Sequence, residues 1–535
     1  MSSVPAVTAP PASVTSDANS DVDECEVLLN RAIEVVGAPA RSPRATGNLA
    51  ANVIKNLAEL AALPWKARIA TPMTGRIVLT LVGLAFTGCM LLALIGLQSD
   101  FSREPKNMEA EVERARQVVR FEQLTPAEVF QQGIKLVGAG AVGSTNQGMS
   151  VALSAEGDTA IVGGPGPNNA DRDRSLSVGP AGAAWVFTRR DGTWTQQGDK
   201  LVGSTSAYGG GLWSQGASVA LSADGNTALV GGPSDDRTTG AAWLFIRSDG
   251  VWTQQGHKLV GAGVYRAGEP PLSLGQGLSV ALSADGNTAI VGGWRAEAAW
   301  VFTRSGDLWS QQGNKLVGTG AVGSARQGMS VALSGDGNTA IVGGWSDNSK
   351  TGAAWVFTRS AGVWTQQGKK LVGIGAVGSA SQGMSVALSA DGNTAIVGGP
   401  DDNPWDRSVP FGLGAAGAAW VFTRSGGTWT QQGNKLVSTG AMGSARQGMS
   451  VALSADGNTA VVGGLADDRG VGAASVFTRS GDHWMQDKRL SGTGAMAVSS
   501  VALSGDGSIV MVGGSNVSGG VGAAWVFARS GGAAD

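Results

Sequence analysis

A motif of roughly 58 residues recurs seven times between residues 129 and 535, and this repeat constrains the fold more than any other feature of the sequence. Each copy contains a version of SVALSADGNTAIVGG, a variable stretch, and a version of GAAWVFTRSGGTWTQQGNKLV, of which the last copy has only the first part. The serine that opens SVALS stands at Ser150, Ser218, Ser279, Ser330, Ser385, Ser450 and Ser500. So regular a repeat predicts an array of like units, in which each unit buries its apolar surface against its neighbours.

Each copy except the last contains the signals for four short antiparallel strands. SVALS predicts the first strand and TAIVGG the second, with an Asp-Gly hairpin turn between them. AAWVFTR predicts the third strand after the variable stretch. WTQQGNKLV predicts the fourth strand after a tight turn such as Ser425-Gly426-Gly427. Seven units of four antiparallel strands predict an all-β fold, a seven-bladed β-propeller.

The two ends of the repeat array complement each other. The last copy ends after the AAWVFAR strand and lacks a fourth strand, whereas residues 129–137 (VFQQGIKLV) match a fourth strand with no preceding three. We therefore expect this N-terminal strand to complete the last blade and close the ring. Closure also removes the free sheet edges through which β-proteins aggregate.

The motifs SVALSADGNTAIVGG and GAAWVFTRSGGTW make residues 129–535 resemble the FG-GAP repeat propellers, the integrin α-subunit type in its bacterial form. Here Gly-Met or Gly-Ala replaces the Phe-Gly pair, and a short Asp-Gly-Asn turn stands where integrins carry a calcium loop. Kelch propellers, which also use a Gly-Gly pair and a later Trp, are the alternative. The resemblance implies a propeller that binds partners rather than one that catalyses a reaction.

Residues 77–97 are 21 consecutive residues without a charge, flanked by Arg76 and Asp100. At 1.5 Å per residue a helix of this length spans roughly 31 Å, enough to cross the hydrocarbon core of a bilayer. An alternative is that translation starts at Met73 and that a lipoprotein signal ends at Cys89. The prediction is a largely disordered cytosolic tail with short helices at 1–75, a transmembrane helix at 76–98, a helical stalk at 99–128 and the propeller at 129–535.

The charges around this segment do not decide its orientation by themselves, because three Lys or Arg precede it closely and four follow it. Those nearest the segment slightly favour a cytoplasmic N-terminus. We therefore expect a single-pass membrane protein whose propeller is periplasmic or extracellular.

Composition argues against several kinds of function. The chain has a net charge of −2 and only 15% charged residues, which argues against a nucleic-acid partner. Two cysteines and two histidines leave little room for a disulfide scaffold, a cysteine metal site or a histidine-based catalytic array. His257 and His483 read as solvated variants of repeat positions. No nucleophile elbow, phosphate loop or HExxH motif occurs, although a pair of catalytic carboxylates across the ring stays open.

Four antiparallel strands place their connections on two opposite faces. The first-to-second and third-to-fourth turns share one face and are short and nearly uniform. The second-to-third loops and the blade-to-blade links share the other face and hold almost all of the length variation. A rigid scaffold with one variable face is a common design for a binding surface.

The aromatic residues divide between the strands and the variable face. Twelve Trp lie in third strands or at the start of fourth strands, where we expect them to pack blades together. The candidate ligand-binding aromatics of the variable face are Trp213, Trp294, Trp345, Trp405, Tyr208 and Tyr265. They form either local packing over the rim or an exposed platform for a glycan or a protein.

Carboxylates also collect in the second-to-third loops. The candidate calcium ligands are Asp235, Asp236, Asp401, Asp402, Asp467 and Asp468, and Asp347 stands in an equivalent loop. Oxygen-rich loops can hold Ca²⁺, although Asp in loops also caps turns through its own backbone. No other cofactor is predicted.

These observations predict a membrane-anchored, non-catalytic binding scaffold whose partner is a protein or a surface polysaccharide, as in adhesion. Two alternatives are a glycan-active enzyme that uses loop carboxylates and a transmembrane sensor that signals through residues 1–76.

Overall fold

The computed structural model describes residues 129–141, 143–166, 182–204, 214–263, 274–403, 415–441, 443–465, 467, 471–490 and 497–529. The chain divides into two compact units, Met1–Glu122 and Gln123–Asp535, and all of the described residues belong to the second unit. The predicted tail, membrane span and stalk lie outside the described residues. Among the residues that are described, no helix is long and apolar enough to cross a membrane.

The second unit consists of seven antiparallel sheets of four strands each, and each sheet is one blade. Blade 1 is β2 (Ser150–Leu153), β3 (Thr159–Gly164), β4 (Ala183–Arg190) and β5 (Thr193–Gln196). Blade 2 is β6 (Ser218–Leu221), β7 (Thr227–Gly232), β8 (Ala241–Ser248) and β9 (Val251–Gln254). Blade 3 is β10 (Gln276–Leu282), β11 (Thr288–Gly293), β12 (Ala298–Ser305) and β13 (Leu308–Gln311). Blade 4 is β14 (Ser330–Leu333), β15 (Thr339–Gly344), β16 (Ala353–Ser360) and β17 (Val363–Gln366).

The remaining blades follow the same order. Blade 5 is β18 (Ser385–Leu388), β19 (Thr394–Gly399), β20 (Ala418–Ser425) and β21 (Thr428–Gln431). Blade 6 is β22 (Gln447–Leu453), β23 (Thr459–Gly464), β24 (Ala473–Ser480) and β25 (His483–Leu490). Blade 7 is β26 (Ser500–Leu503), β27 (Ile509–Gly514), β28 (Ala523–Arg529) and the N-terminal β1 (Val129–Gln131). Two single helical turns, α5 (Asp235–Thr238) and α6 (Asp347–Lys350), lie in the second-to-third loops of blades 2 and 4.

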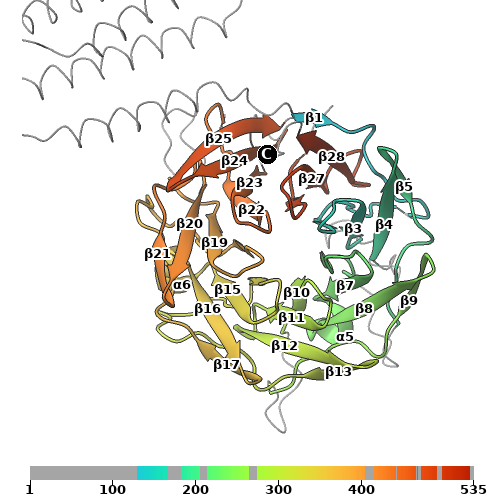
Figure 1. Cartoon of the computed structure of the whole chain (residues 1–535), viewed down its shortest axis with the longest axis horizontal. Helices are drawn as coiled ribbons and strands as arrows, with labels where there is room; N and C mark the ends of the chain where they lie inside the picture. Colours follow the sequence, from blue (N-terminus) through green and yellow to red (C-terminus); the bar gives the residue numbers. More distant parts are fainter. Residues whose placement is uncertain are drawn as a thin grey trace, which may run out of the picture. The chain divides into compact units, whose positions relative to one another are not determined.

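The blades form a closed ring. The first strands of neighbouring blades contact each other in the order β2, β6, β10, β14, β18, β22, β26 and again β2. Figure 1 shows the seven sheets around a central axis, with fourth strands such as β9, β13, β17 and β21 at the rim. The sheet topology therefore confirms the predicted seven-bladed propeller with four-stranded antiparallel blades.

The N-terminal strand completes blade 7, as the ends of the repeat array predict. Val129 pairs with Arg529, and Gln131 pairs with Phe527. Farther along, the backbone N–H of Leu136 donates to the carbonyl of Ala524 at 2.7 Å. The ring is thus closed by hydrogen bonds between its two ends.

A circuit of backbone hydrogen bonds joins the seven first-to-second turns. In each blade the residue after SVALS donates its N–H to the carbonyl of the same residue in the next blade, at 2.8 to 2.9 Å. The circuit runs through Ala155, Ala223, Ala284, Gly335, Ala390, Ala455, Gly505 and back to Ala155. Every member donates once and accepts once, so neither group is left unpaired at this position.

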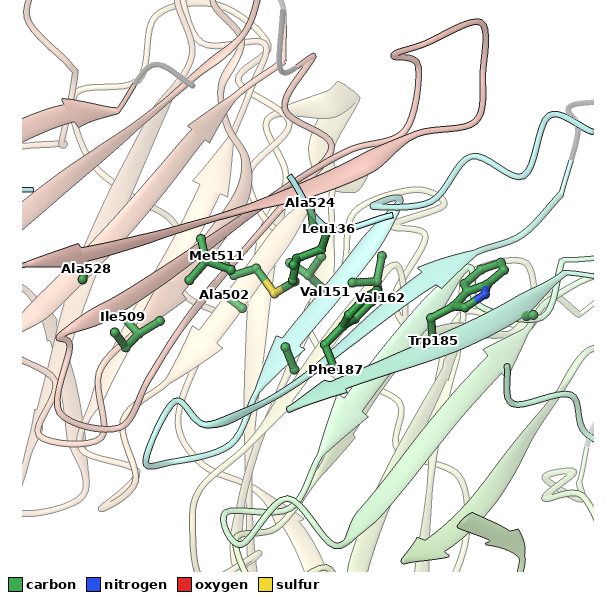
Figure 2. Packing of buried hydrophobic residues seen from close by; sticks show 13 residues of the cluster. Leu136, Val151, Val162, Trp185, Phe187, Ala502, Ile509, Met511, Ala524 and Ala528 are labelled. Atoms are coloured by element: carbon green, nitrogen blue, oxygen red, sulfur yellow. The ribbon is translucent and has the colours of Figure 1, made fainter. Parts of the chain in front are cut away.

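The apolar core lies between the blades. The second strands, such as TAIVGG in β15, are buried along their whole length because both of their faces pack on sheets. One cluster joins Met511 and Ala524 of blade 7 to Val162 and Phe187 of blade 1, and Leu136 of the closing strand packs with them (Figure 2). Core packing therefore holds blade to blade, and the same packing secures the junction at which the ring closes.

A tryptophan in the third strand and a glycine in the preceding link pack as a pair. Trp355 is fully buried, and its indole Nε1 donates to the carbonyl of Thr319 at 2.8 Å. A Cβ on Gly318 would lie 2.1 Å from Cδ1 of this indole, so only glycine fits there. The same arrangement recurs at Gly138–Trp185, Gly203–Trp243, Gly261–Trp300 and Gly373–Trp420. The link between two blades is thus held against the core of the second blade.

The fourth strands are shorter than the sequence predicts. In blade 5 the strand β21 ends at Gln431, the chain turns at Gly433, and Leu436 then makes an isolated bridge to Ala419. Glycine at this turn has a φ of +65°, which interrupts the ladder that WTQQGNKLV was expected to form. Blade 6 lacks this glycine, and there β25 continues to Leu490 with one shift of register opposite Val476 and Phe477.

Candidate functional site

The turn face, made by the first-to-second and third-to-fourth turns, satisfies its polar groups internally. In blade 4 the Oγ of Ser334 donates to Asp336, and the backbone N–H of Asn338 donates to the same carboxylate at 2.9 Å. Burial raises the pKa of the Asp336 carboxyl, but these hydrogen bonds outweigh burial, so its pKa lies below the ordinary value. The pKa is lowered in the same way at Asp224, Asp285, Asp391, Asp456 and Asp506.

The tryptophans that start the fourth strands also serve blade packing. Arg359 lies over the ring of Trp364, 5.4 Å from its centroid, and donates to Asn338 in the turn of its own blade. Both Arg359 and the Trp364 indole donate to Gln312 of blade 3, at 3.1 and 3.0 Å. These contacts join two blades, which supports the interpretation of the strand Trp as structural residues.

The acidic loops of the variable face hold ion pairs. Asp347 is 1% exposed, and its carboxylate pairs with Lys370 of the same blade at 2.5 Å. Its other oxygen accepts the backbone N–H of Val322, in the preceding link, at 2.7 Å. Asp402 makes the matching contacts with Lys435 at 2.5 Å and with the N–H of Val377 at 2.7 Å. Asp235 pairs with Lys258, and Asp467 pairs with Arg489.

These pairs change how the predicted calcium ligands are understood. One carboxylate oxygen of Asp235, Asp402 and Asp467 is already bound to a cationic side chain. Asp401 pairs with Arg446 at 2.8 Å and accepts a hydrogen bond from Ser381, whereas Asp236 is half-buried. Asp468 lies outside the described residues. Within the described ranges no three His, Cys, Asp or Glu side chains gather into a group that could hold a metal. Calcium at these loops stays a prediction.

The basic partners of these aspartates are functional neighbours that the sequence analysis missed. The separation is 23 residues in blades 2 and 4 but 33 residues in blade 5, because the second-to-third loop varies in length. No fixed spacing therefore marks the pair. The available signal was the basic residue that stands just before Leu in the KLV segment, as at Lys370.

Two of the predicted aromatics, Trp294 and Trp345, are described, and both are half-buried on the variable face of neighbouring blades. The guanidinium carbons of Arg295 and Arg326 each lie 5.0 Å from the centroid of the Trp294 ring. Lys350 lies 5.8 Å from the Trp345 ring. The predicted residues outside the described ranges are Trp213, Trp405, Tyr208 and Tyr265.

Trp294 also touches the link on its other side. A Cβ on Gly275, in the link from blade 2 to blade 3, would lie 3.1 Å from the indole Nε1 of Trp294. Arg326 belongs to the link from blade 3 to blade 4. The indole therefore contacts both links of blade 3, and the arginines beside it give this part of the variable face a positive charge.

A cavity of about 250 Å³ lies between blades 5 and 6. Its lining includes Lys435 and Leu436, which follow β21, and His483 and Gln486 of β25. Lys435 is already paired with Asp402. The cavity therefore offers no cation that is free of an internal carboxylate.

Comparison with known proteins yields matches of structure but not of sequence. No protein-family model matches the chain, and no curated protein matches it. A candidate 6-phosphogluconolactonase from Bacteroides uniformis is 11% identical, with a TM-score of 0.43, over 66% of this chain and 88% of its own. A candidate 6-phosphogluconolactonase from Bacteroides fragilis is 12% identical, with a TM-score of 0.43, over 64% and 84%. Hydrazine synthase from Kuenenia stuttgartiensis is 13% identical, with a TM-score of 0.42, over 71% and 96%. These similarities carry no argument about activity, and the propeller assignment rests on the sheet topology described above.

Proposed function

We propose that the protein is a non-catalytic binding scaffold whose variable face, at blades 3 and 4, binds an acidic surface polysaccharide. The observation that carries the proposal is the cluster of cations around two half-buried indoles, Trp294 with Arg295 and Arg326, and Trp345 with Lys350. Indoles offer an apolar surface to sugar rings, and guanidinium and ammonium groups bind carboxylates.

The charge balance of these residues supports an anionic partner. Lys258, Lys370 and Lys435 are each paired with a buried aspartate, so their charges are compensated inside the protein. In the described part of the chain, no carboxylate lies within ion-pair distance of Arg326 or Lys350. Their positive charges are therefore available to a ligand.

The position of these residues also favours a binding role over a structural one. Trp294 and Trp345 follow the second strands, in loops that add no rung to the blade ladders. The turn face, in contrast, repeats the same hydrogen bonds from blade to blade. Variation confined to one face of a rigid ring is what a partner-specific surface requires.

Capture by immobilised polysaccharides tests this proposal. The full-length protein in detergent is passed over acidic, sulfated and neutral polysaccharides. We expect retention on the acidic polymers and a loss of at least tenfold in affinity for the Trp294→Ala, Arg326→Gln double variant. Arg190→Gln is the control, because it removes one exposed arginine from the turn face. Equal retention of all three proteins, or retention of none, would refute the proposal.

The proposal includes the membrane anchor predicted at residues 77–97. The membrane anchor is supported only by the length of the uncharged segment, so it needs its own test. We expect the protein to stay with membranes during alkaline extraction, and the propeller to be cleaved by protease added outside intact cells. Release by alkali, or cleavage only after lysis, would contradict the anchored arrangement.

A further inference from the structure

We infer that Lys315 in blade 3 binds a carboxylate of the ligand, in the place that a loop aspartate fills in blades 2, 4 and 5. This inference rests on the proposed function, and it names uronic acid residues of an oligosaccharide as the ligand class. It concerns a residue that no sequence motif singled out.

The lysine of the KLV segment binds a carboxylate in blades 2, 4 and 5, whereas in blades 1 and 7 it donates to an uncharged oxygen. Lys370 and Lys435 lie 2.5 Å from the carboxylates of Asp347 and Asp402, and Lys258 pairs with Asp235. In blades 4 and 5 the second carboxylate oxygen accepts a link N–H at 2.7 Å. A carboxylate held by one ammonium and one backbone N–H is thus a feature of the variable face in blades 4 and 5.

Blade 3 keeps the lysine but lacks the aspartate. Only Trp294, Arg295, Ala296 and Glu297 connect β11 to β12, whereas residues 345–352 connect the equivalent strands of blade 4. The backbone beside Lys315 is placed as in blade 4, because Leu316 bridges Ala299 just as Leu371 bridges Ala354. Lys315 therefore extends from the same point of the blade toward a shorter loop.

The acid that the short loop does contain is engaged elsewhere. Glu297 has a φ of +50°, and its carboxylate accepts hydrogen bonds from Ser324 Oγ and from the backbone N–H of Ala325 at 3.2 Å. Both partners belong to the link that follows blade 3. Glu297 therefore fastens this link and does not take the place of Asp347.

Lys315 is consequently a half-buried cation for which the described residues supply no carboxylate within ion-pair distance. A partly desolvated ammonium gains more from an incoming anion than a fully solvated one does, because less water has to be displaced. A carboxylate is the anion that this repeat position binds in the neighbouring blades. In blade 4 the equivalent lysine reaches the second-to-third loop, and the loop that carries Trp294 is the second-to-third loop of blade 3. A sugar chain bound at the indole can therefore present its uronate groups to Lys315.

The test measures binding of tri-galacturonate to the full-length protein in detergent by isothermal titration calorimetry. Lys315→Met removes the charge and keeps most of the aliphatic stem. Lys369→Met is the matched control, since it removes an exposed lysine from the same end of blade 4. We expect at least a tenfold weaker affinity for Lys315→Met, less than a twofold change for Lys369→Met, and weak binding of the methyl-esterified trisaccharide to the wild type.

A second variant supplies the missing carboxylate from within. Ala296 occupies the third position of its loop, as Asp347 does in blade 4. Ala296→Asp is expected to lose tri-galacturonate binding to the same extent as Lys315→Met, with an unchanged melting temperature as evidence of folding. Unchanged binding by both variants, or no binding of the trisaccharide by the wild type, would overturn the inference. Loss of binding only in the Trp294→Ala, Arg326→Gln variant would leave the proposed function intact and remove Lys315 from it.

Discussion

The Oγ atoms of Ser438 and Ser475 lie 2.6 Å apart in the junction between blades 5 and 6, and both side chains are buried. In the five other described junctions of this kind, glycine stands in place of Ser438 and tryptophan in place of Ser475. The two positions therefore change together. Where the link residue is glycine, there is room for the tryptophan indole of the third strand. Where the link residue is Ser438, the third strand carries the smaller Ser475, and the two hydroxyls share a hydrogen bond.

This coupling predicts a non-additive pair of substitutions. Ser475→Trp alone should destabilise the protein by about 1–3 kcal/mol, because the new indole meets the Cβ of Ser438. Ser438→Gly alone leaves the buried Ser475 hydroxyl without its partner, at a similar cost. The double variant should recover part of both losses. Chemical unfolding of the four proteins measures this, and strictly additive free energies would argue against the coupling.

The buried third-strand tryptophans should dominate stability. Trp355→Ala removes a fully buried indole and is expected to lower the free energy of unfolding by about 3–5 kcal/mol. Val363→Ala, in the same blade but with a largely exposed side chain, should change it by about 0.5 kcal/mol or less. Denaturant titration followed by tryptophan fluorescence separates the two. A small effect of Trp355→Ala on the free energy of unfolding would mean that the buried tryptophans do not dominate stability.

The turn-face aspartates should make the propeller sensitive to acid. Their pKa values are lower in the folded state than the ordinary value of 3.8. The stabilisation they provide is therefore complete above pH 3.8 and is lost as the pH falls through the folded-state pKa. Thermal unfolding between pH 2 and pH 6 should reveal this loss. Asp336→Asn removes one titrating group and should reduce the loss of thermal stability at low pH. If the variant loses as much stability as the wild type, the turn-face aspartates are not the cause of the acid sensitivity.

The closing strand should behave as a separable element. Deletion of residues 129–137 exposes the edge of β28, and the amide protons on that edge, such as the one that Ala524 donates to Leu136, should then exchange faster with solvent. A synthetic peptide of the deleted sequence should restore their protection by adding the missing strand. Hydrogen exchange read by mass spectrometry tests both statements. Full protection of β28 without the peptide would show that blade 7 does not depend on the N-terminal strand.

Most of the fold can be predicted because it is encoded locally and repeated. Asp-Gly turns, alternating strand patterns and the incomplete terminal copies identify the strands and the ring closure without any knowledge of contacts. The Gln-Gly break after Gln431 was missed, since its effect depends on a positive φ that the surrounding strand signal obscures. The axial circuit through Ala155 was also missed, because it depends on how seven separate turns are placed in space.

The candidate site is less predictable than the fold. From the sequence, a loop aspartate such as Asp402 could bind calcium, cap a turn or form an ion pair. Only the position of Lys435 in three dimensions shows that Asp402 forms an ion pair. The importance of Lys315 is visible only by comparing it with equivalent lysines whose aspartates are present. A missing partner leaves no motif in the sequence, so it becomes apparent only when the blades are superimposed on one another.

Blade 7 is built from strands of both ends of the repeat array, and this gives the ring a defined path for mechanical tension. The strand β1 is hydrogen-bonded to β28, yet its chain continues covalently into blade 1 through Gly138. A pull on the chain before Val129 therefore reaches blade 7 through hydrogen bonds and blade 1 through the backbone. The load is divided over the one junction where the two ends of the propeller meet. Before the ring opens, the bridge between Leu136 and Ala524 and the apolar cluster that joins blades 7 and 1 would both have to separate.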